Sequence, residues 1–260
     1  MAIRSRILPL SRPRVFVNDL LHFARRVPSI PVQRLCHLAP VVAARRALPA
    51  PRPPWSALFV KAYALVAEEM PPLRRAYCAF PWPHLVEYDR SVAAVAVERD
   101  WHDDKAVLTV RIKHPARLPL GAIAERIRQA QTAPLEQIKD FRRALWLSGL
   151  PRPLRRLLWW LSLNSGRWRG NVCGTFGLST YSALGAESLH PLSPLTATLN
   201  YGVINPQGQV PVRLIYDHRV FDGATAARAL LRLEELLNTC IRSELLAWPG
   251  SAPLPQPRST

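Results

Sequence analysis

Four stretches of the chain place apolar and polar side chains at helical spacing: residues 15–27, 55–70, 119–130 and 224–242. Side chains three and four positions apart in such a stretch share one face of a helix. Pro28 ends the first predicted helix and Pro71–Pro72 the second, because proline lacks the amide hydrogen that a helix needs. Pro49–Pro54 contains four prolines and predicts a loop.

Other apolar patterns predict β-strands. Residues 91–98 are short, apolar and β-branched, and residues 106–113 alternate between apolar and polar. From Asn171 onward strand patterns dominate, and they cover residues 172–180, 195–204 and 210–218. Gly208, in the polar run at 205–209, suits a hairpin connection. Residues 32–47 predict a strand followed by a turn.

This order of elements predicts one α+β domain over residues 1–248. The sequence shows no internal repeat and no linker long enough to divide it. With 48% hydrophobic residues, the 260-residue chain has enough apolar surface to bury a core. Residues 249–260 are rich in proline and predict a disordered tail.

The four cysteines, Cys36, Cys78, Cys173 and Cys240, are widely spaced and form no CxxC pair or Cys/His cluster. We expect buried free thiols in a reducing compartment and no metal site. The N-terminus is too short and too interrupted by arginine for a signal peptide, and no window is long enough to span a membrane. These features predict a cytoplasmic protein.

The charge balance points to anionic partners. Thirty-five Lys and Arg against eighteen Asp and Glu give a formal charge of +17. Such a field attracts nucleic acid, anionic lipid, an acidic carrier protein or the phosphates of coenzyme A. Nucleic acid ranks last, because the sequence contains no zinc-finger, helix-turn-helix or RNA-binding pattern. An arginine-rich composition can also reflect a GC-rich genome.

Residues 141–169 combine four tryptophans, many leucines and a cluster of arginines. Arginine close to tryptophan and leucine is typical of a segment that lies among lipid headgroups. The segment therefore predicts a helix pair that faces a membrane or binds an acyl chain, with peripheral attachment to the inner face of the membrane. The alternative is a helix buried between subunits.

The last predicted strand ends in a His-x-x-x-Asp-Gly sequence formed by His218, Asp222 and Gly223. A histidine at a strand end can project into a cleft, and its near-neutral pKa suits proton transfer. The aspartate can order the loop, and the glycine allows a turn where a side chain would clash. From spacing alone, a structural histidine is the more common case.

Residues 216–237 resemble the C-terminal active-site segment of the 2-oxoacid dehydrogenase acyltransferase catalytic domain, within the chloramphenicol acetyltransferase-like superfamily. Three further stretches resemble the same domain in the right order: residues 8–14, 56–70 and 175–180. The resemblance covers residues 7–245. It implies a two-layer α+β sandwich in which helices cover a mixed β-sheet.

The resemblance also implies residue roles. His218 is the general base, and Ser179 stabilises the oxyanion, with Thr180 as an alternative hydroxyl. Asp222 orders the catalytic loop, and Arg14, one of four arginines between positions 4 and 14, pairs with it. The family is trimeric, so His218 would face Ser179 of a neighbouring subunit.

Two differences between this sequence and the family concern the acyl donor. The sequence contains no lipoyl domain or subunit-binding domain, and the connection between Tyr201 and Val210 is short for the family. We therefore expect a stand-alone acyltransferase that has no tightly bound cofactor. It would move an acyl group from coenzyme A or acyl carrier protein to a hydroxyl, thiol or amine. The alternatives are an acyltransferase core that uses a lipoyl domain on a separate protein, and a non-catalytic trimeric scaffold.

Overall fold

The structure, a computed structural model, describes residues 3, 5–102 and 104–248. Six strands form one mixed sheet in the order β1-β8-β7-β6-β4-β5. Their bounds are β1 (Ser29–His37), β4 (Val92–Trp101), β5 (Asp104–Lys113), β6 (Phe176–Leu178), β7 (Ala197–Tyr201) and β8 (Gln209–Asp217). β6 runs parallel to β4 and β7, and the other neighbours are antiparallel. β2 (Arg75–Cys78) and β3 (His84–Glu87) form a separate antiparallel pair.

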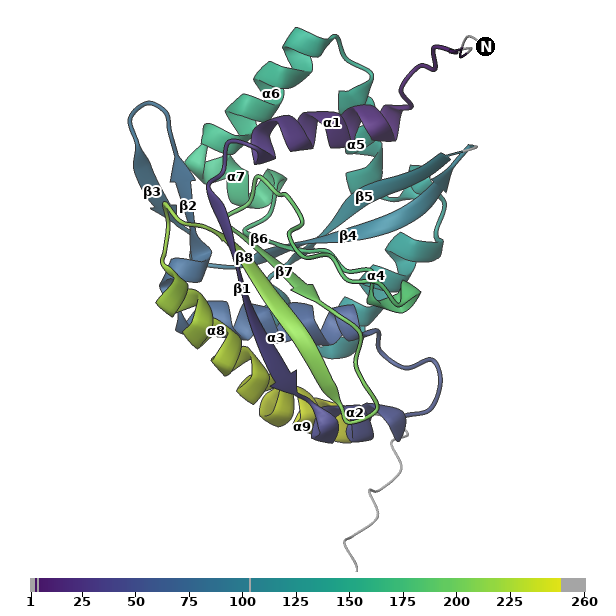
Figure 1. The fold of residues 1–260 in the computed structure, drawn as a ribbon, viewed down its shortest axis with the longest axis vertical. Helices are drawn as coiled ribbons and strands as arrows, with labels where there is room; N and C mark the ends of the chain where they lie inside the picture. The colour runs from purple at the N-terminus through teal and green to yellow at the C-terminus, as the bar shows by residue number, and fades with distance from the viewer. Residues whose placement is uncertain (1–2, 4, 103, 249–260) are drawn as a thin grey trace, which may run out of the picture.

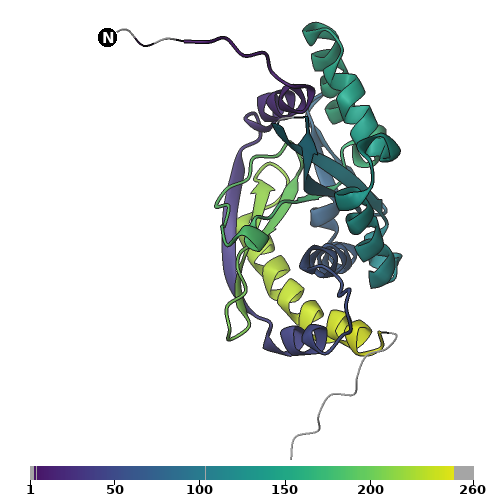
Figure 2. The ribbon, with the colours of Figure 1, turned by 90° about the vertical axis from the view of Figure 1, so that its right-hand side faces the viewer.

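The helices lie mainly on one face of the sheet and around its β5 end (Figures 1 and 2). They are α1 (Arg12–Ala24), α2 (Ala39–Arg46), α3 (Trp55–Glu69), α4 (Leu120–Thr132), α5 (Lys139–Ser148), α6 (Arg152–Asn164), α7 (Gly166–Val172), α8 (Gly223–Leu236) and α9 (Arg242–Leu246). Within the described ranges, every helix is too short or too polar to cross a bilayer.

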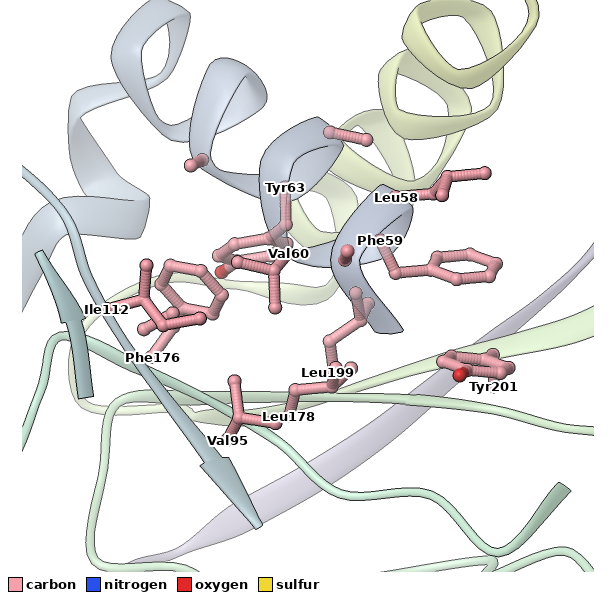
Figure 3. Close-up of a cluster of buried hydrophobic side chains, with 14 of the residues drawn as sticks. Leu58, Phe59, Val60, Tyr63, Val95, Ile112, Phe176, Leu178, Leu199 and Tyr201 are labelled. Atoms are coloured by element: carbon pink, nitrogen blue, oxygen red, sulfur yellow. The ribbon is translucent and has the colours of Figure 1, made fainter. Parts of the chain in front are cut away.

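The main core lies between α3 and the sheet (Figure 3). Alternate strand residues point toward α3, because successive side chains of a strand face opposite sides. Phe59 stacks on Tyr201 with ring centroids 4.2 Å apart, and Tyr63 packs against Phe176 at 4.5 Å. α3 is buried along most of its circumference, which explains its strongly apolar sequence.

The opposite face of the sheet has a different composition. Ala94, Gly177, Thr198, Asn200 and Arg213 alternate with core residues and therefore point away from α3. The connection 180–195 lies over part of this face, where Glu187 accepts a hydrogen bond from Arg213 Nη2 at 2.8 Å. Small and polar side chains thus line one face of a sheet whose other face is an apolar core.

Most of the predicted elements are confirmed, and three need correction. Residues 39–46 form α2 where a turn was predicted, since the chain continues past Pro40 into a helix. The strand predicted at 172–180 is only three residues long, because α7 extends to Val172. The predicted C-terminal helix is interrupted by a π-helix at Leu237–Ile241. The predicted tail lies outside the described residues.

The cysteine prediction is confirmed in part. All four thiols are free, and Cys36 and Cys78 are buried. Burial raises the pKa of Cys36 to about 12, which keeps this thiol protonated and unreactive. Cys173 is only partly buried and Cys240 is exposed, so the expectation of burial is wrong for Cys240. Cys240 lies in the π-helix, on the side of this segment that faces away from the core.

Candidate active site

His218 lies immediately after the end of β8, in the first position of a turn, and it is exposed. Its backbone N–H donates to the carbonyl of Pro28 at 3.2 Å, and its ring packs against Tyr216 with centroids 5.8 Å apart. The imidazole forms no hydrogen bond with any described residue. Both ring nitrogens are therefore available to a substrate, as a general base requires.

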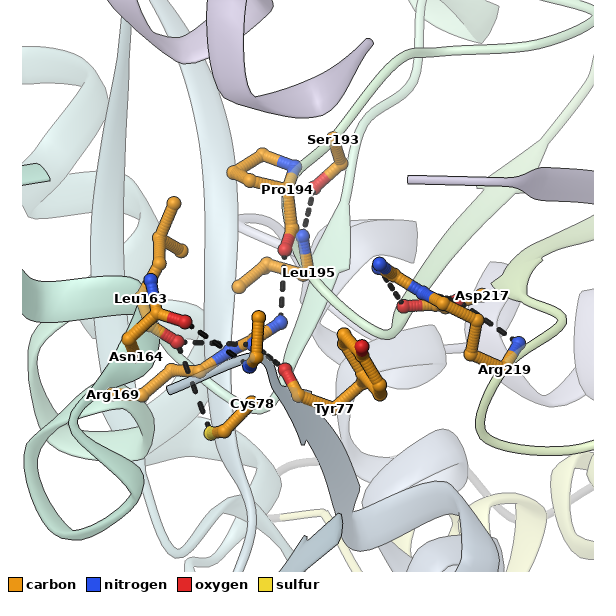
Figure 4. Close-up of polar contacts among 11 residues, drawn as sticks. Tyr77, Cys78, Leu163, Asn164, Arg169, Ser193, Pro194, Leu195, Asp217 and Arg219 are labelled. Carbon is orange, nitrogen blue, oxygen red and sulfur yellow. Dashed lines mark hydrogen bonds and ion pairs between the residues drawn. The ribbon is translucent and has the colours of Figure 1, made fainter. Parts of the chain in front are cut away.

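The turn that carries His218 is fixed by its two neighbours (Figure 4). The Asp217 carboxylate is buried and accepts hydrogen bonds from the Arg219 backbone N–H at 3.0 Å, from Nε at 2.9 Å and from Nη2 at 2.7 Å. The Arg219 guanidinium also lies 4.1 Å from the centre of the Tyr77 ring. This bidentate, stacked arginine holds the backbone on both sides of the histidine.

Sequence reasoning missed the role of this Asp217–Arg219 pair. An acid and an arginine two positions apart at a strand end were visible in the sequence, but Tyr77 is distant from them along the chain. A second arginine completes the support: Arg169 donates to the carbonyls of Tyr77, Leu163 and Pro194 at 2.5, 3.2 and 3.0 Å. The tryptophan-rich segment is thus bonded to the strand that supports the His218 turn (Figure 4).

Asp222 is the N-cap of α8. Its carboxylate accepts the backbone N–H of Thr225 at 2.9 Å, and this hydrogen bond lowers the pKa of Asp222, with smaller contributions from Arg228 and His218. Asp222 therefore stays ionised and anchors the end of the turn. Gly223 begins α8, and its backbone φ lies outside the left-handed region. A Cβ added there would lie 3.4 Å from the Tyr216 hydroxyl, an ordinary contact distance. The expectation that a side chain would clash there is wrong within this chain.

The predicted pair of Arg14 with Asp222 is not formed in this chain. Arg14 lies in α1 and binds the carboxylate of Asp104, at the start of β5, with Nε at 3.1 Å and Nη2 at 3.0 Å. α1 packs against β5, which brings Arg14 to Asp104. Asp222 uses the amide of Thr225 in place of an arginine side chain.

Ser179 directly follows β6, on the face of the sheet opposite to the main core. Its carbonyl accepts a hydrogen bond from Asn200 Nδ2 at 2.6 Å, and its hydroxyl has no partner among the described residues. The Thr180 hydroxyl, in contrast, donates to the Tyr201 carbonyl at 3.0 Å. Ser179 therefore offers a free hydroxyl, whereas Thr180 uses its own to hold the strand.

His218 and Ser179 do not meet within one chain. Leu178 pairs with Leu199, so Ser179, the next residue, lies beside Asn200 of β7. Asn200 pairs with Arg213 of β8, so Ser179 is also level with Arg213. His218 is five positions further along the chain than Arg213, directly after the end of β8. At ~3.3 Å per residue and ~4.8 Å between strands, the two Cα atoms lie ~19 Å apart. A site that uses both side chains needs a second copy of the chain.

No family sequence model matches the chain, and no curated protein matches it in sequence. Solved structures do match. The dihydrolipoamide acetyltransferase of Azotobacter vinelandii has 22% identity and a TM-score of 0.67, covering 94% of this chain and 95% of its own. A probable dihydrolipoamide acetyltransferase of Listeria monocytogenes has 17% identity and a TM-score of 0.63, covering 90% and 94%.

The cubic core of a pyruvate dehydrogenase multienzyme complex also matches, with 20% identity, a TM-score of 0.62 and coverage of 94% and 95%. At this level of identity the likeness concerns the fold. The predicted α+β sandwich is confirmed: this chain has the fold of the acyltransferase catalytic cores of 2-oxoacid dehydrogenase complexes.

Proposed function

We propose that the protein is a thioester-dependent acyltransferase with His218 as its general base and Ser179 as its oxyanion donor. The observation that carries this proposal is the His218 turn, in which a buried aspartate and a stacked arginine fix the backbone on both sides of an exposed imidazole. The investigation of the Azotobacter vinelandii enzyme concerned one serine, one histidine and an asparagine four positions after the histidine. His218 and Asp222 have the same spacing.

The chemistry follows from these groups. His218 removes the proton from the acceptor hydroxyl, thiol or amine, and the acceptor attacks the thioester carbonyl. The carbonyl oxygen becomes an oxyanion, which accepts a hydrogen bond from the Ser179 hydroxyl. The C–S bond then breaks, and the departing thiolate takes the proton from His218. The imidazole and the hydroxyl are regenerated, and metal and redox groups take no part in this sequence.

The proposed enzyme is a trimer or a multiple of trimers. The ~19 Å between His218 and Ser179 within one chain leaves each half of the site without its partner. A structure with the same fold is the cubic core of a pyruvate dehydrogenase multienzyme complex. In a trimer, His218 of one subunit meets Ser179 of the next across a shared channel.

Coenzyme A or acyl carrier protein is the proposed donor. Both carry phosphate, which suits a chain with a formal charge of +17. A lipoyl domain on a separate protein is the second candidate donor, favoured by the likeness to dihydrolipoamide acetyltransferases. A non-catalytic scaffold with this fold would have no need for an open imidazole held by two residues.

The test compares wild type with His218→Ala and Ser179→Ala, with coenzyme A thioesters, acyl carrier protein thioesters and an acylated lipoyl domain as donors. Loss of the base should lower kcat about 100- to 10,000-fold, and loss of the hydroxyl about 100- to 1000-fold. Released thiol is measured with a chromogenic disulfide. His84→Ala is the matched control, because His84 lies on β3 and contacts the carbonyl of Trp82. Turnover by His218→Ala equal to wild type would overturn the mechanism.

A further inference from the structure

A cavity of about 710 Å³ lies on the face of the sheet opposite to the main core, among β4, β5, β6, β7 and the helices α1, α5 and α6. Its floor is made by small side chains, Ala94 and Ala96 of β4 and Gly177 of β6. Because these positions alternate with core residues along their strands, their small side chains point to the cavity and not to the main core. Larger residues at the same positions would fill the space.

The walls are predominantly apolar. Leu20 of α1, Leu147 of α5 and Trp159 of α6 line the cavity, and Trp159 packs against Phe16 with centroids 5.5 Å apart. Arg111, which also contributes to the lining, is paired with Asp140. A space of this size with predominantly apolar walls suits an aliphatic ligand.

The helices that form these walls are fixed by an ion cluster. Asp19 of α1 is buried, and its carboxylate lies 2.5 Å from Arg155 Nε and 2.6 Å from Arg156 Nε of α6. These charge-assisted contacts join α1 to α6, the two helices that contribute Leu20 and Trp159 to the walls. The cavity is therefore built into the fold by its floor and its supports.

The cavity reaches the proposed catalytic serine. Ser179 is part of its lining, as is Thr198 on the adjacent strand. The Thr198 hydroxyl is buried, only 4% of this residue is exposed, and the oxygen has no hydrogen-bond partner among the described residues. Because a buried, unpartnered hydroxyl is unfavourable, it indicates a place where a ligand supplies the missing partner. A carbonyl oxygen between Thr198 and Ser179 would fulfil that role.

We propose that this cavity holds the aliphatic chain of a medium- or long-chain acyl thioester, with its carbonyl at Ser179. The proposal rests on the acyltransferase function above and names its substrate class. The acyl tail lies over Ala96 between the sheet and α1, and the thioester sulfur faces the entrance used by His218 of the neighbouring subunit. Each methylene that moves from water into the cavity contributes about a fourfold gain in affinity.

Two substitutions test the cavity. Ala96→Phe fills the floor, and Val107→Trp reaches the same space from β5, where Val107 is 38% exposed and tolerates a larger side chain. Ala122→Phe is the matched control on the exposed side of α4. Circular dichroism and sedimentation confirm that each variant folds and assembles as wild type does.

The first measurement is kcat/KM for acetyl, octanoyl, dodecanoyl and hexadecanoyl thioesters. We expect wild type to prefer dodecanoyl over acetyl by at least 100-fold. Ala96→Phe and Val107→Trp should lower the ratio of the dodecanoyl to the acetyl kcat/KM at least tenfold relative to wild type, whereas Ala122→Phe should leave this ratio unchanged. Equal kcat/KM for all chain lengths in wild type would overturn the proposal while leaving the acyltransferase function intact.

The second measurement is independent of turnover. Calorimetric titration with dodecanoic acid should show one site per chain, no binding of acetate, and at least tenfold weaker binding of dodecanoic acid to Ala96→Phe. If this binding is found in a protein that transfers no acyl group, the cavity stands and the proposed function fails. If a neighbouring subunit fills the cavity, dodecanoic acid does not bind, and the proposal is overturned.

Discussion

At the scale of single residues, the position of His218 depends on side chains that touch no substrate. Asp217 and Arg219 flank the histidine and bond to each other, and the ring of Tyr77 supports the arginine from a separate sheet. A lysine at position 219 would keep the charge but lose the forked geometry and the stacking. Arg219 is therefore a positioning residue.

We predict that Arg219→Lys lowers kcat about 10- to 100-fold with little change in KM, because a displacement of ~1 Å costs on the order of 100-fold in rate. Arg117→Lys is the control, since Arg117 is exposed and lies 4.0 Å from Glu68. The thermal unfolding midpoint of each variant shows whether a loss of kcat comes from a misplaced His218 or from a destabilised fold. A kcat for Arg219→Lys equal to that of the control would contradict a positioning role.

Asp104 gives a pH prediction. Hydrogen bonds from Arg14 and then Ser11 lower the pKa of Asp104 to about 2 in the folded chain. A carboxyl whose pKa is depressed by folding stabilises the fold above its ordinary pKa, and this contribution is lost as the pH falls toward 2. The pair is exposed, so the effect is small and screened by salt.

We therefore expect Asp104→Asn to have a lower thermal midpoint than wild type at pH 4 to 6, and the difference to shrink toward zero as the pH falls through 2 at low salt. Thermal unfolding followed by circular dichroism measures it. Taking the difference between the two proteins removes the contribution of the other carboxylates. A difference that does not change with pH would show that the Arg14 pair contributes no ionisation-linked stability.

At the scale of elements, α6 directs Arg155 and Arg156 inward and a stripe of leucines outward. Arg155 and Arg156 face Asp19, while Leu154, Leu157 and Leu161 form a stripe on the opposite side with 44, 51 and 47% of their surface exposed. α6 lies at the outer edge of the molecule in Figure 1. The exposed arginines available for lipid phosphates are therefore on other positions, such as 142, 143, 152 and 167.

This stripe predicts binding to anionic membranes. We expect wild type to sediment with vesicles that contain phosphatidylglycerol, and less so at high salt. Replacing Leu154, Leu157 and Leu161 with serine should lower the membrane partition coefficient about 10- to 100-fold. Each substitution removes part of the free energy gained when an exposed leucine moves from water into the membrane. The double variant Leu184→Ser/Leu189→Ser is the control, since both leucines are exposed in the connection 180–195. Equal sedimentation of the two variants would contradict the prediction.

The same elements show what sequence can and cannot predict. α3 and β8 were predicted because their patterns are local, and the His218 motif because its three residues lie within six positions. Arg14 was paired with the wrong acid, because the docking of α1 on β5 decides its partner. The orientation of α6 could not be predicted from the sequence for a similar reason. A buried Asp19 on another helix attracts its arginines, and no local pattern shows this.

At the scale of the whole molecule, the two proposed catalytic side chains lie at opposite ends of a path across three strands. Ser179 adjoins the cavity between the sheet and α1, and His218 projects from the far end of β8. Each chain would thus carry half of two different sites. This arrangement makes the active site a property of the contact between subunits and gives a direct test of it.

Neither His218→Ala nor Ser179→Ala should be active alone, but mixed trimers of the two should be. A working site needs His218 from a Ser179→Ala chain and Ser179 from a His218→Ala chain. In a random one-to-one mixture, about a quarter of the contacts have this combination, so we expect ~25% of wild-type activity. The two variants are denatured together and refolded, or coexpressed with different tags, and turnover is measured against each variant treated alone. If both residues of a site came from one chain, every chain would stay defective, and the mixture would be no more active than its components.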